Sequence, residues 1–297
     1  MTDSRKINNV LEFDKLWNYN KPDETEKKFR EILDEVKDSG NKSAYLQLLT
    51  QLARTQGLQR KYDEANKILD EVESQILNND IKIVKTRYLL EIGRTFNSSK
   101  QKGKARELFL EAYELCNETE TDFYKIDAAH MLGIVEPPEE GLKWNEIGMK
   151  LAEDSKDEKA KGWVGSFYNN IGWTYHDKNE FEKALAIFEK NVIWHTEKKS
   201  GDRLIIAKWC VARTLRSLGR IEEAIKIQKS LLSEIEEKKL SEDGFIFEEL
   251  GECYLISGNK TESQKNFGIA YEMLSKDEWL SENAKDRLGR MKELSDL

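Results

Sequence analysis

The feature of this sequence that most restricts its fold is a small residue that returns at a nearly constant interval. At six regularly spaced positions glycine or alanine follows an aliphatic residue, and successive positions lie 40, 40, 39, 40 and 39 residues apart. The six positions are Ala53, Gly93, Gly133, Gly172, Ala212 and Gly251. A constant period of this length indicates a chain in which one supersecondary unit is repeated and stacked on its neighbours.

Each copy is followed by a similar apolar pattern. Gly172 precedes Tyr175 by three residues, Ala184 by twelve and Phe188 by sixteen. The corresponding residues are Phe96, Ala105 and Phe109 after Gly93, Met149 and Ala152 after Gly133, and Tyr254, Phe267 and Ala270 after Gly251. These spacings, broken by short polar turns, are typical of two amphipathic helices that form a pair.

Gly172 stands beside Trp173, in the middle of a helix-favouring run. Glycine costs about 1 kcal/mol relative to alanine inside a helix, so packing must offset this cost. We expect that the two helix backbones approach closely at Gly172, with Ala184 on the opposite side of the contact.

Composition narrows the class of protein. Charged residues make up 35% of the chain and proline occurs three times, which favours long, solvated helices. The 48 basic and 56 acidic residues give a net charge of -8, and no long basic run appears, which argues against nucleic-acid or membrane binding.

The sequence also predicts a cytoplasmic location. Residues 1–17 mix charges into their apolar positions, unlike an export signal, and the longest uncharged stretch, residues 162–176, is too short to cross a bilayer. Cys116, Cys210 and Cys253 are odd in number and far apart, which suits reduced thiols better than disulfides or a zinc site.

The small residue, the aromatic residue three positions later, and the alanine and aromatic residue of the second helix resemble the tetratricopeptide repeat family. The period is longer than the usual repeat of about 34 residues, as in long-repeat branches of this superfamily. The resemblance implies an all-α fold, a right-handed α-α superhelix (a TPR-like solenoid) of antiparallel helix pairs.

We expect one solenoid over residues 1–297. Its units are a divergent N-terminal unit at 1–40, then 41–80, 81–120, 121–159, 160–200, 201–239 and 240–278. Residues 279–297 are expected to form a capping helix with an apolar stripe of Ala284, Leu288, Met291 and Leu294.

Catalytic signatures are missing. The chain has no nucleophile elbow, no phosphate-binding glycine loop and no H-E-x-x-H motif. None of the three histidines, His130, His176 and His195, has a second histidine or a cysteine at ligand spacing. We therefore expect no catalytic residues, no metal site and no cofactor, and we do not expect an enzyme.

In the tetratricopeptide fold, the residue directly after the small one points into the concave groove, as do residues about one turn away. Arginine occupies this position three times, at Arg54, Arg94 and Arg213. The predicted groove residues are Arg94, His130, Asn169, Asn170, Trp173, His176, Trp209, Arg213 and Arg216. The last full unit contributes Glu248, Glu249 and Glu252 instead, so we expect an acidic C-terminal end.

Two interpretations of these residues stay open. Arginine can bind carboxylates or phosphates, tryptophan offers apolar area and asparagine holds a peptide backbone. Alternatively, the arginines pair internally with Asp127, Glu91 or Asp177, and the tryptophans belong to the core.

The leading functional hypothesis is a non-catalytic scaffold that binds a peptide or protein segment in its groove, with a partner that carries an acidic or carboxylate-bearing segment. The alternative is a ligand- or peptide-sensing regulatory solenoid that acts through a partner protein.

Overall fold

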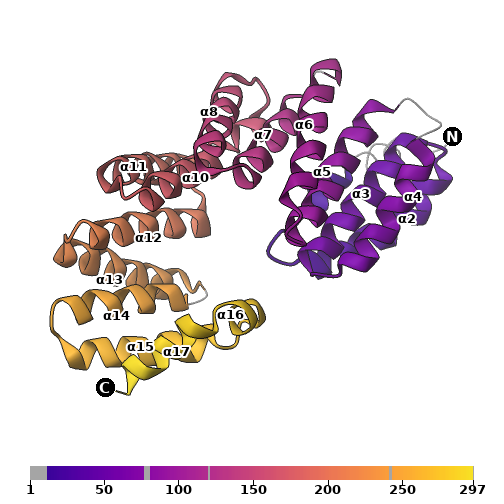
Figure 1. Cartoon of the computed structure of the whole chain (residues 1–297). Coiled ribbons are helices and arrows are strands. Elements are labelled where there is room, and N and C mark those ends of the chain that lie inside the picture. Colours follow the sequence, from indigo (N-terminus) through magenta and orange to yellow (C-terminus); the bar gives the residue numbers. More distant parts are fainter. Residues whose placement is uncertain (1–11, 77–80, 120, 241–242, 297) are drawn as a thin grey trace. The chain divides into compact units, whose positions relative to one another are not determined.

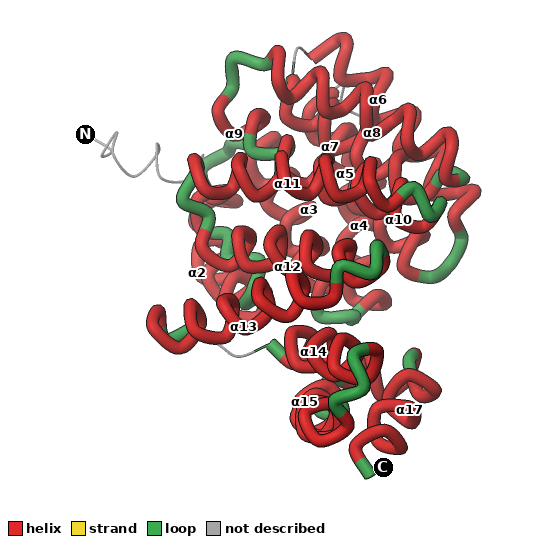
Figure 2. The backbone as a smooth tube through the Cα atoms, turned by 90° about the vertical axis from the view of Figure 1, so that its left-hand side faces the viewer, coloured by secondary structure: helices red, strands yellow, loops and turns green. Residues whose placement is uncertain are grey.

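The fold is all-helical, as predicted. The structure, a computed structural model, describes residues 12–76, 81–119, 121–240 and 243–296, and no strand occurs among them (Figure 2). The chain divides into two compact units, residues 1–167 and 168–297, which are described separately.

The first unit contains a short 3₁₀ helix followed by paired α-helices (Figure 1). Its elements are η1 (Phe13–Leu16), α2 (Pro22–Asp38), α3 (Lys42–Leu58), α4 (Tyr62–Ile76), α5 (Lys82–Ser98), α6 (Lys102–Thr119), α7 (Asp122–Val135), α8 (Pro138–Asp154) and α9 (Glu158–Lys161). The next helix, α10 (Val164–Asp177), contains the boundary between the units.

The second unit continues the alternation of first and second helices. Its elements are the remainder of α10, then α11 (Phe181–Glu197), α12 (Gly201–Ser217), α13 (Ile221–Lys238), α14 (Gly244–Ile256), α15 (Lys260–Leu274), α16 (Glu278–Asn283) and α17 (Lys285–Ser295). That residues 1–297 form one continuous solenoid stays a prediction.

Five of the helix pairs are joined by the same three-residue turn. The middle residue of each turn has a left-handed backbone, with φ between 59° and 78°; these residues are Arg60, Lys100, Asn179, Gly219 and Gly258. The N–H group of the next residue donates to the carbonyl five positions earlier at 2.9 Å, in the pairs Lys61 to Gln56, Gln101 to Phe96, Glu180 to Tyr175, Arg220 to Leu215 and Asn259 to Tyr254. This is the Schellman arrangement, which satisfies a carbonyl at the helix end and reverses the chain.

The recurring glycines accommodate aromatic rings. A Cβ atom built on Gly172 would lie 2.4 Å from the Phe188 ring, and one on Gly93 would lie 2.5 Å from the Phe109 ring. Phe188 is fully buried. The space at Gly172 is therefore filled by the ring sixteen residues later, and not by direct backbone contact opposite Ala184 as the sequence suggested.

The pair α7 and α8 departs from this register. Pro137 and Pro138 follow α7, which ends two residues after Gly133, whereas α10 ends five residues after Gly172. A residue before proline is disfavoured in the helical conformation, so the helix ends early. As a result Asn145, and not Met149 as predicted, faces Gly133, at 2.6 Å from a Cβ built there. A Cβ built on Gly141 would lie 2.7 Å from the carbonyl oxygen of Gly133, so a side chain at this position would meet that backbone.

The ends of the chain differ in detail from the predicted pattern. Phe13 lies in a 3₁₀ helix, where its ring packs edge-on against Phe29 at 6.2 Å. At the other end, two short helices, α16 and α17, replace one capping helix. Leu288 and Met291 of the predicted stripe are buried against the last pair.

Candidate ligand-binding surfaces

The first helices of the second unit carry a row of three aromatic side chains. Trp173 on α10 lies 6.0 Å from Trp209 on α12, and Trp209 lies 6.4 Å from Phe245 on α14, measured between ring centroids. The indole N–H of Trp209 donates to the Phe245 carbonyl at 3.2 Å, which fixes its ring. The three rings are partly exposed, so they contribute to the core and also offer apolar area to a ligand.

Two arginines beside this row share one buried carboxylate. Arg216 donates from Nε and Nη2 to both oxygens of Glu249, at 2.7 and 2.9 Å. Arg213 Nε lies 3.1 Å from the same carboxylate. Burial, and then repulsion from Arg216, lower the pKa of Arg213. Arg213 and Arg216 thus share the carboxylate of Glu249, while Glu252 and Glu248 also attract Arg213.

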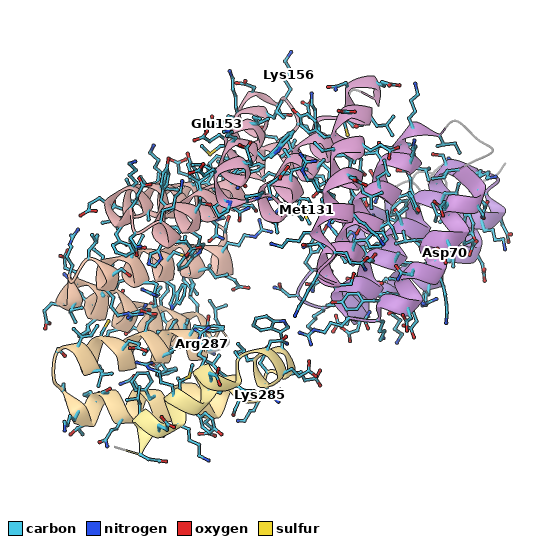
Figure 3. All side chains as sticks on the ribbon, in the orientation of Figure 1. Asp70, Met131, Glu153, Lys156, Lys285 and Arg287 are labelled. Carbon is cyan, nitrogen blue, oxygen red and sulfur yellow. The ribbon has the colours of Figure 1, made fainter. Side chains whose placement is uncertain are left out.

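The acidic residues of the last pair are ion-paired and do not form an acidic end. Glu248 accepts from Arg287 on α17, which is labelled in Figure 3, and Glu252 accepts from Arg290. Arg287 also lies 5.1 Å from the Phe245 ring centroid. The sequence-based expectation of an acidic C-terminal end is therefore corrected, because these carboxylates already have cationic partners.

His176 connects to Arg213 through a hydroxyl group. Arg213 Nη1 donates to Ser217 Oγ at 2.7 Å, and Ser217 Oγ lies 3.0 Å from His176 Nε2. Burial, then Arg213, lower the pKa of His176. Asp177, named as a candidate arginine partner, lies 4.0 Å from His176 instead.

The two predicted asparagines on α10 are partly buried. Asn169 Oδ1 accepts from the Cys210 thiol at 3.7 Å, and the Asn170 carbonyl accepts from Thr174. We define the Trp–Arg cluster as Trp173, His176, Trp209, Arg213 and Arg216, with Glu249; Asn169 and Asn170 lie on the same first helix as Trp173.

The first unit contains a more complete ion-pair network, the Arg94 cluster of Arg54, Glu91, Arg94 and Asp127. Arg94 pairs with Glu91 at 2.7 Å and also with Asp127. Arg54 lies 3.7 Å from Glu91. The Arg94 side chain is 11% exposed, and its pKa is raised because the attraction of Asp127 and Glu91 outweighs the opposing effect of burial. Two cations and two anions balance in this cluster.

His130 lies among aromatic rings, 4.9 Å from Trp163 and 5.7 Å from Phe167 between centroids. Burial is the main reason that its pKa falls to about 4. The side chain is therefore neutral at physiological pH, and its surroundings resemble a packing site.

The predicted site residues thus belong to two units, with Arg94 and His130 in the first and the other seven in the second. Sequence reasoning missed Phe245, although a signal existed: Trp173, Trp209 and Phe245 are evenly spaced, 36 residues apart. Within the described ranges, no three histidine, cysteine or acidic side chains gather as a metal ion would require, and no helix is long and apolar enough to cross a membrane.

Comparison with known proteins agrees with this architecture. The sequence model of the tetratricopeptide repeat matches residues 165–190, which include Gly172, Trp173 and Phe188. A search of curated proteins found no match.

Solved structures show the same fold at low identity. The apo form of RapI has a TM-score of 0.67 and 14% identity, over 90% of this chain and 77% of that one. A Rap protein complexed with Competence and Sporulation Factor has a TM-score of 0.65 and 16% identity, over 91% and 76%. NprR in complex with its cognate peptide NprX has a TM-score of 0.59 and 12% identity, over 89% and 77%.

The paired helices, the recurrent turn and the repeated contact between glycine and phenylalanine define a helical-repeat protein. More specifically, residues 165–190 match the tetratricopeptide repeat, and the same pattern of small and apolar residues recurs along the chain with a period near 40 residues.

Proposed function

We propose that the protein is a non-catalytic scaffold that binds a peptide or protein segment at the Trp–Arg cluster. The observation that carries this proposal is that Arg213 shares the carboxylate of Glu249 with Arg216. The partly exposed rings of Trp173 and Trp209 lie on the same row of first helices.

These groups define the chemistry of the partner. A carboxylate would complete the pairing of Arg213 through charge-assisted hydrogen bonds, and apolar side chains would cover the indole rings. We therefore expect a segment with a C-terminal or side-chain carboxylate next to a large apolar residue. The Rap protein complexed with Competence and Sporulation Factor and NprR in complex with its cognate peptide NprX support a ligand of this kind on this fold.

Arg94 and His130 take a smaller part in this proposal. Arg94 already has two carboxylate partners, and His130 is surrounded by rings. A ligand would have to displace existing contacts to reach either group, so we place the primary site in the second unit.

NprR in complex with its cognate peptide is also compatible with the alternative, a ligand- or peptide-sensing regulatory solenoid that acts through a partner protein. In that function, binding at the Trp–Arg cluster would change how a partner protein is engaged elsewhere on the chain. Peptide binding that leaves small-angle X-ray scattering unchanged would favour the scaffold, whereas a ligand-induced change would favour the regulator.

The site is tested with a pooled library of synthetic heptapeptides, half with free C-terminal carboxylates and half amidated. We expect the immobilised protein to enrich peptides with a free carboxylate and an apolar residue, as read by mass spectrometry. Arg213→Ala and Trp209→Ala should each reduce this enrichment at least tenfold.

Two control variants match these substitutions in the same unit. Arg220 pairs with Glu223 in an exposed turn, and Trp194 lies on the second helix α11. Arg220→Ala and Trp194→Ala should enrich the same peptides as the unaltered protein. Equal enrichment by Arg213→Ala and Arg220→Ala would contradict the proposed site.

A further inference from the structure

The second unit also contains a pocket whose lining residues are distinct from the Trp–Arg cluster. A pocket of about 520 Å³ is formed by α11, α12 and α13. Its lining consists of Glu189, Val192, Ile193, Lys208, Val211, Ile227, Ser230 and Leu231. None of these residues belongs to the Trp–Arg cluster.

The pocket has an apolar interior. Val211 and Leu231 at its base are 8% and 1% exposed, while Ile193 is 59% exposed. Val192 and Ile227 are partly exposed and complete the aliphatic lining. A volume of this size lies within the range of small-molecule sites, which are apolar with a few placed polar groups.

Lys208 provides a cation at this apolar surface. Its ammonium group pairs with Glu234 at 2.6 Å, and Lys238 pairs with the other oxygen of the same carboxylate, also at 2.6 Å. Two lysines therefore share the carboxylate of Glu234. Lys208 can turn to a ligand while Glu234 keeps Lys238.

Glu189 is the acidic member of the lining. It is exposed on α11, where solvent screens its charge. Lys208 is less exposed, at 31% of its side chain, so its charge is screened less and is the stronger influence on a bound head group.

We propose that this pocket binds a medium-chain fatty acid, with the alkyl chain against Val211, Leu231 and Ile227 and the carboxylate on Lys208. The aliphatic lining favours a flexible alkyl chain, and Lys208, the cation of the lining and less exposed than Glu189, favours an anionic head group. This inference is independent of the proposed peptide site.

Three probes with the same alkyl chain test the head group: decanoate, decanol and decyltrimethylammonium, each titrated below its micelle concentration by isothermal titration calorimetry. Decanoate should bind at least tenfold more tightly than decanol, and the cation should bind most weakly. Failure of decanoate to bind, or equal binding of decanoate and decanol, would overturn the proposal.

Two variants test the position of the ligand. Ser230 is exposed on α13, so Ser230→Phe fills the pocket from outside and should weaken decanoate binding at least tenfold. Ser233→Phe, one turn along the same helix and outside the lining, should bind as the unaltered protein does. Equal binding by these two variants would place the ligand elsewhere and overturn the proposal.

Lys208→Met keeps an apolar stem and removes the charge. It should weaken decanoate at least tenfold and leave decanol unchanged, whereas Lys226→Met on the exposed side of α13 should alter neither. Glu189→Gln should strengthen decanoate binding by about twofold to threefold, since it removes a repulsive charge. An unchanged preference for decanoate in Lys208→Met would overturn the role of this lysine.

Discussion

The Arg94 cluster and the Trp–Arg cluster each contain an arginine that directly follows the recurring small residue, but these two arginines have different acidic partners. Arg94 follows Gly93 and Arg213 follows Ala212, each at the recurring small residue. Arg94 has Glu91 and Asp127, whereas Arg213 shares Glu249 with Arg216. The same repeat position thus carries an arginine with two carboxylate partners in the first unit and an arginine that shares one carboxylate in the second.

The sequence separations explain this difference. Asp127 lies 33 residues after Arg94, and Glu249 lies 33 residues after Arg216. Arg216 is therefore the counterpart of Arg94, because each pairs with an acid on the next first helix along the chain. Arg213 is the additional cation of the second unit.

The largest expected effect is the loss of stability in Arg94→Ala. The substitution leaves Glu91 and Asp127 together in a buried site, with Arg54 as a distant partner of Glu91 at 3.7 Å. Removing one member of a buried ion pair costs about 3–5 kcal/mol. Urea unfolding followed by circular dichroism should show a loss of this size. Arg30→Ala, which breaks an exposed pair with Glu26, should cost less than about 1 kcal/mol; equal losses would contradict the structural role of Arg94.

A smaller effect should appear on acidification, because His130 beside the Arg94 cluster resists protonation. Its pKa is about 4 in the folded protein and near 6.5 when unfolded. Between these values the unfolded chain binds a proton that the folded chain does not, so stability falls as the pH drops from 6.5 towards 4.

At pH 4.5 this loss of stability reaches about 2.5 kcal/mol, since it grows by 1.36 kcal/mol for each pH unit between the two pKa values. His130→Phe, which suits the surrounding rings, should lose less stability than the unaltered protein between pH 7 and pH 4.5. Parallel pH profiles of unfolding free energy for the two proteins would argue against a buried neutral histidine.

Arg216→Ala should have an effect of about 1–2 kcal/mol, which is smaller than that of Arg94→Ala. Glu249 loses its two-point partner but keeps Arg213, whose Nε lies 3.1 Å away. The remaining arginine then becomes fully committed to Glu249, so peptide capture should also fall. A stability loss equal to that of Arg94→Ala would show that Arg213 does not compensate.

The helical pairs could be predicted from the sequence because small and aromatic residues at fixed spacings mark each pair. Small residues recur at about 40-residue intervals, and phenylalanine follows sixteen residues after Gly93, Gly172 and Gly251. The rings of Phe109, Phe188 and Phe267 do meet these glycines. The prediction of Met149 was wrong because Pro137 and Pro138 shorten the connection and move Asn145 opposite Gly133.

The candidate site was less predictable, since its electrostatics depend on contacts between helices about 33 residues apart. The sequence identified the arginines, and it named Glu91 and Asp127 as alternative partners for them. It did not assign Glu249 to Arg213 and Arg216, or Glu248 to Arg287, because those pairings require the register of successive first helices. The spacing of residue types shows where an arginine lies in each repeat. Which acids balance its charge depends on the helices that pack beside it.

Arg213→Ala tests the central claim most directly, through peptide affinity and stability measured on the same sample. The peptide is the most enriched carboxylate-terminated heptapeptide, and the measurements are calorimetric titration and urea unfolding. We predict that affinity falls at least tenfold while the free energy of unfolding changes by less than about 1 kcal/mol, because Arg216 keeps Glu249. Unchanged affinity, or a loss of stability as large as that of Arg94→Ala, would contradict the assignment of Arg213 to ligand binding.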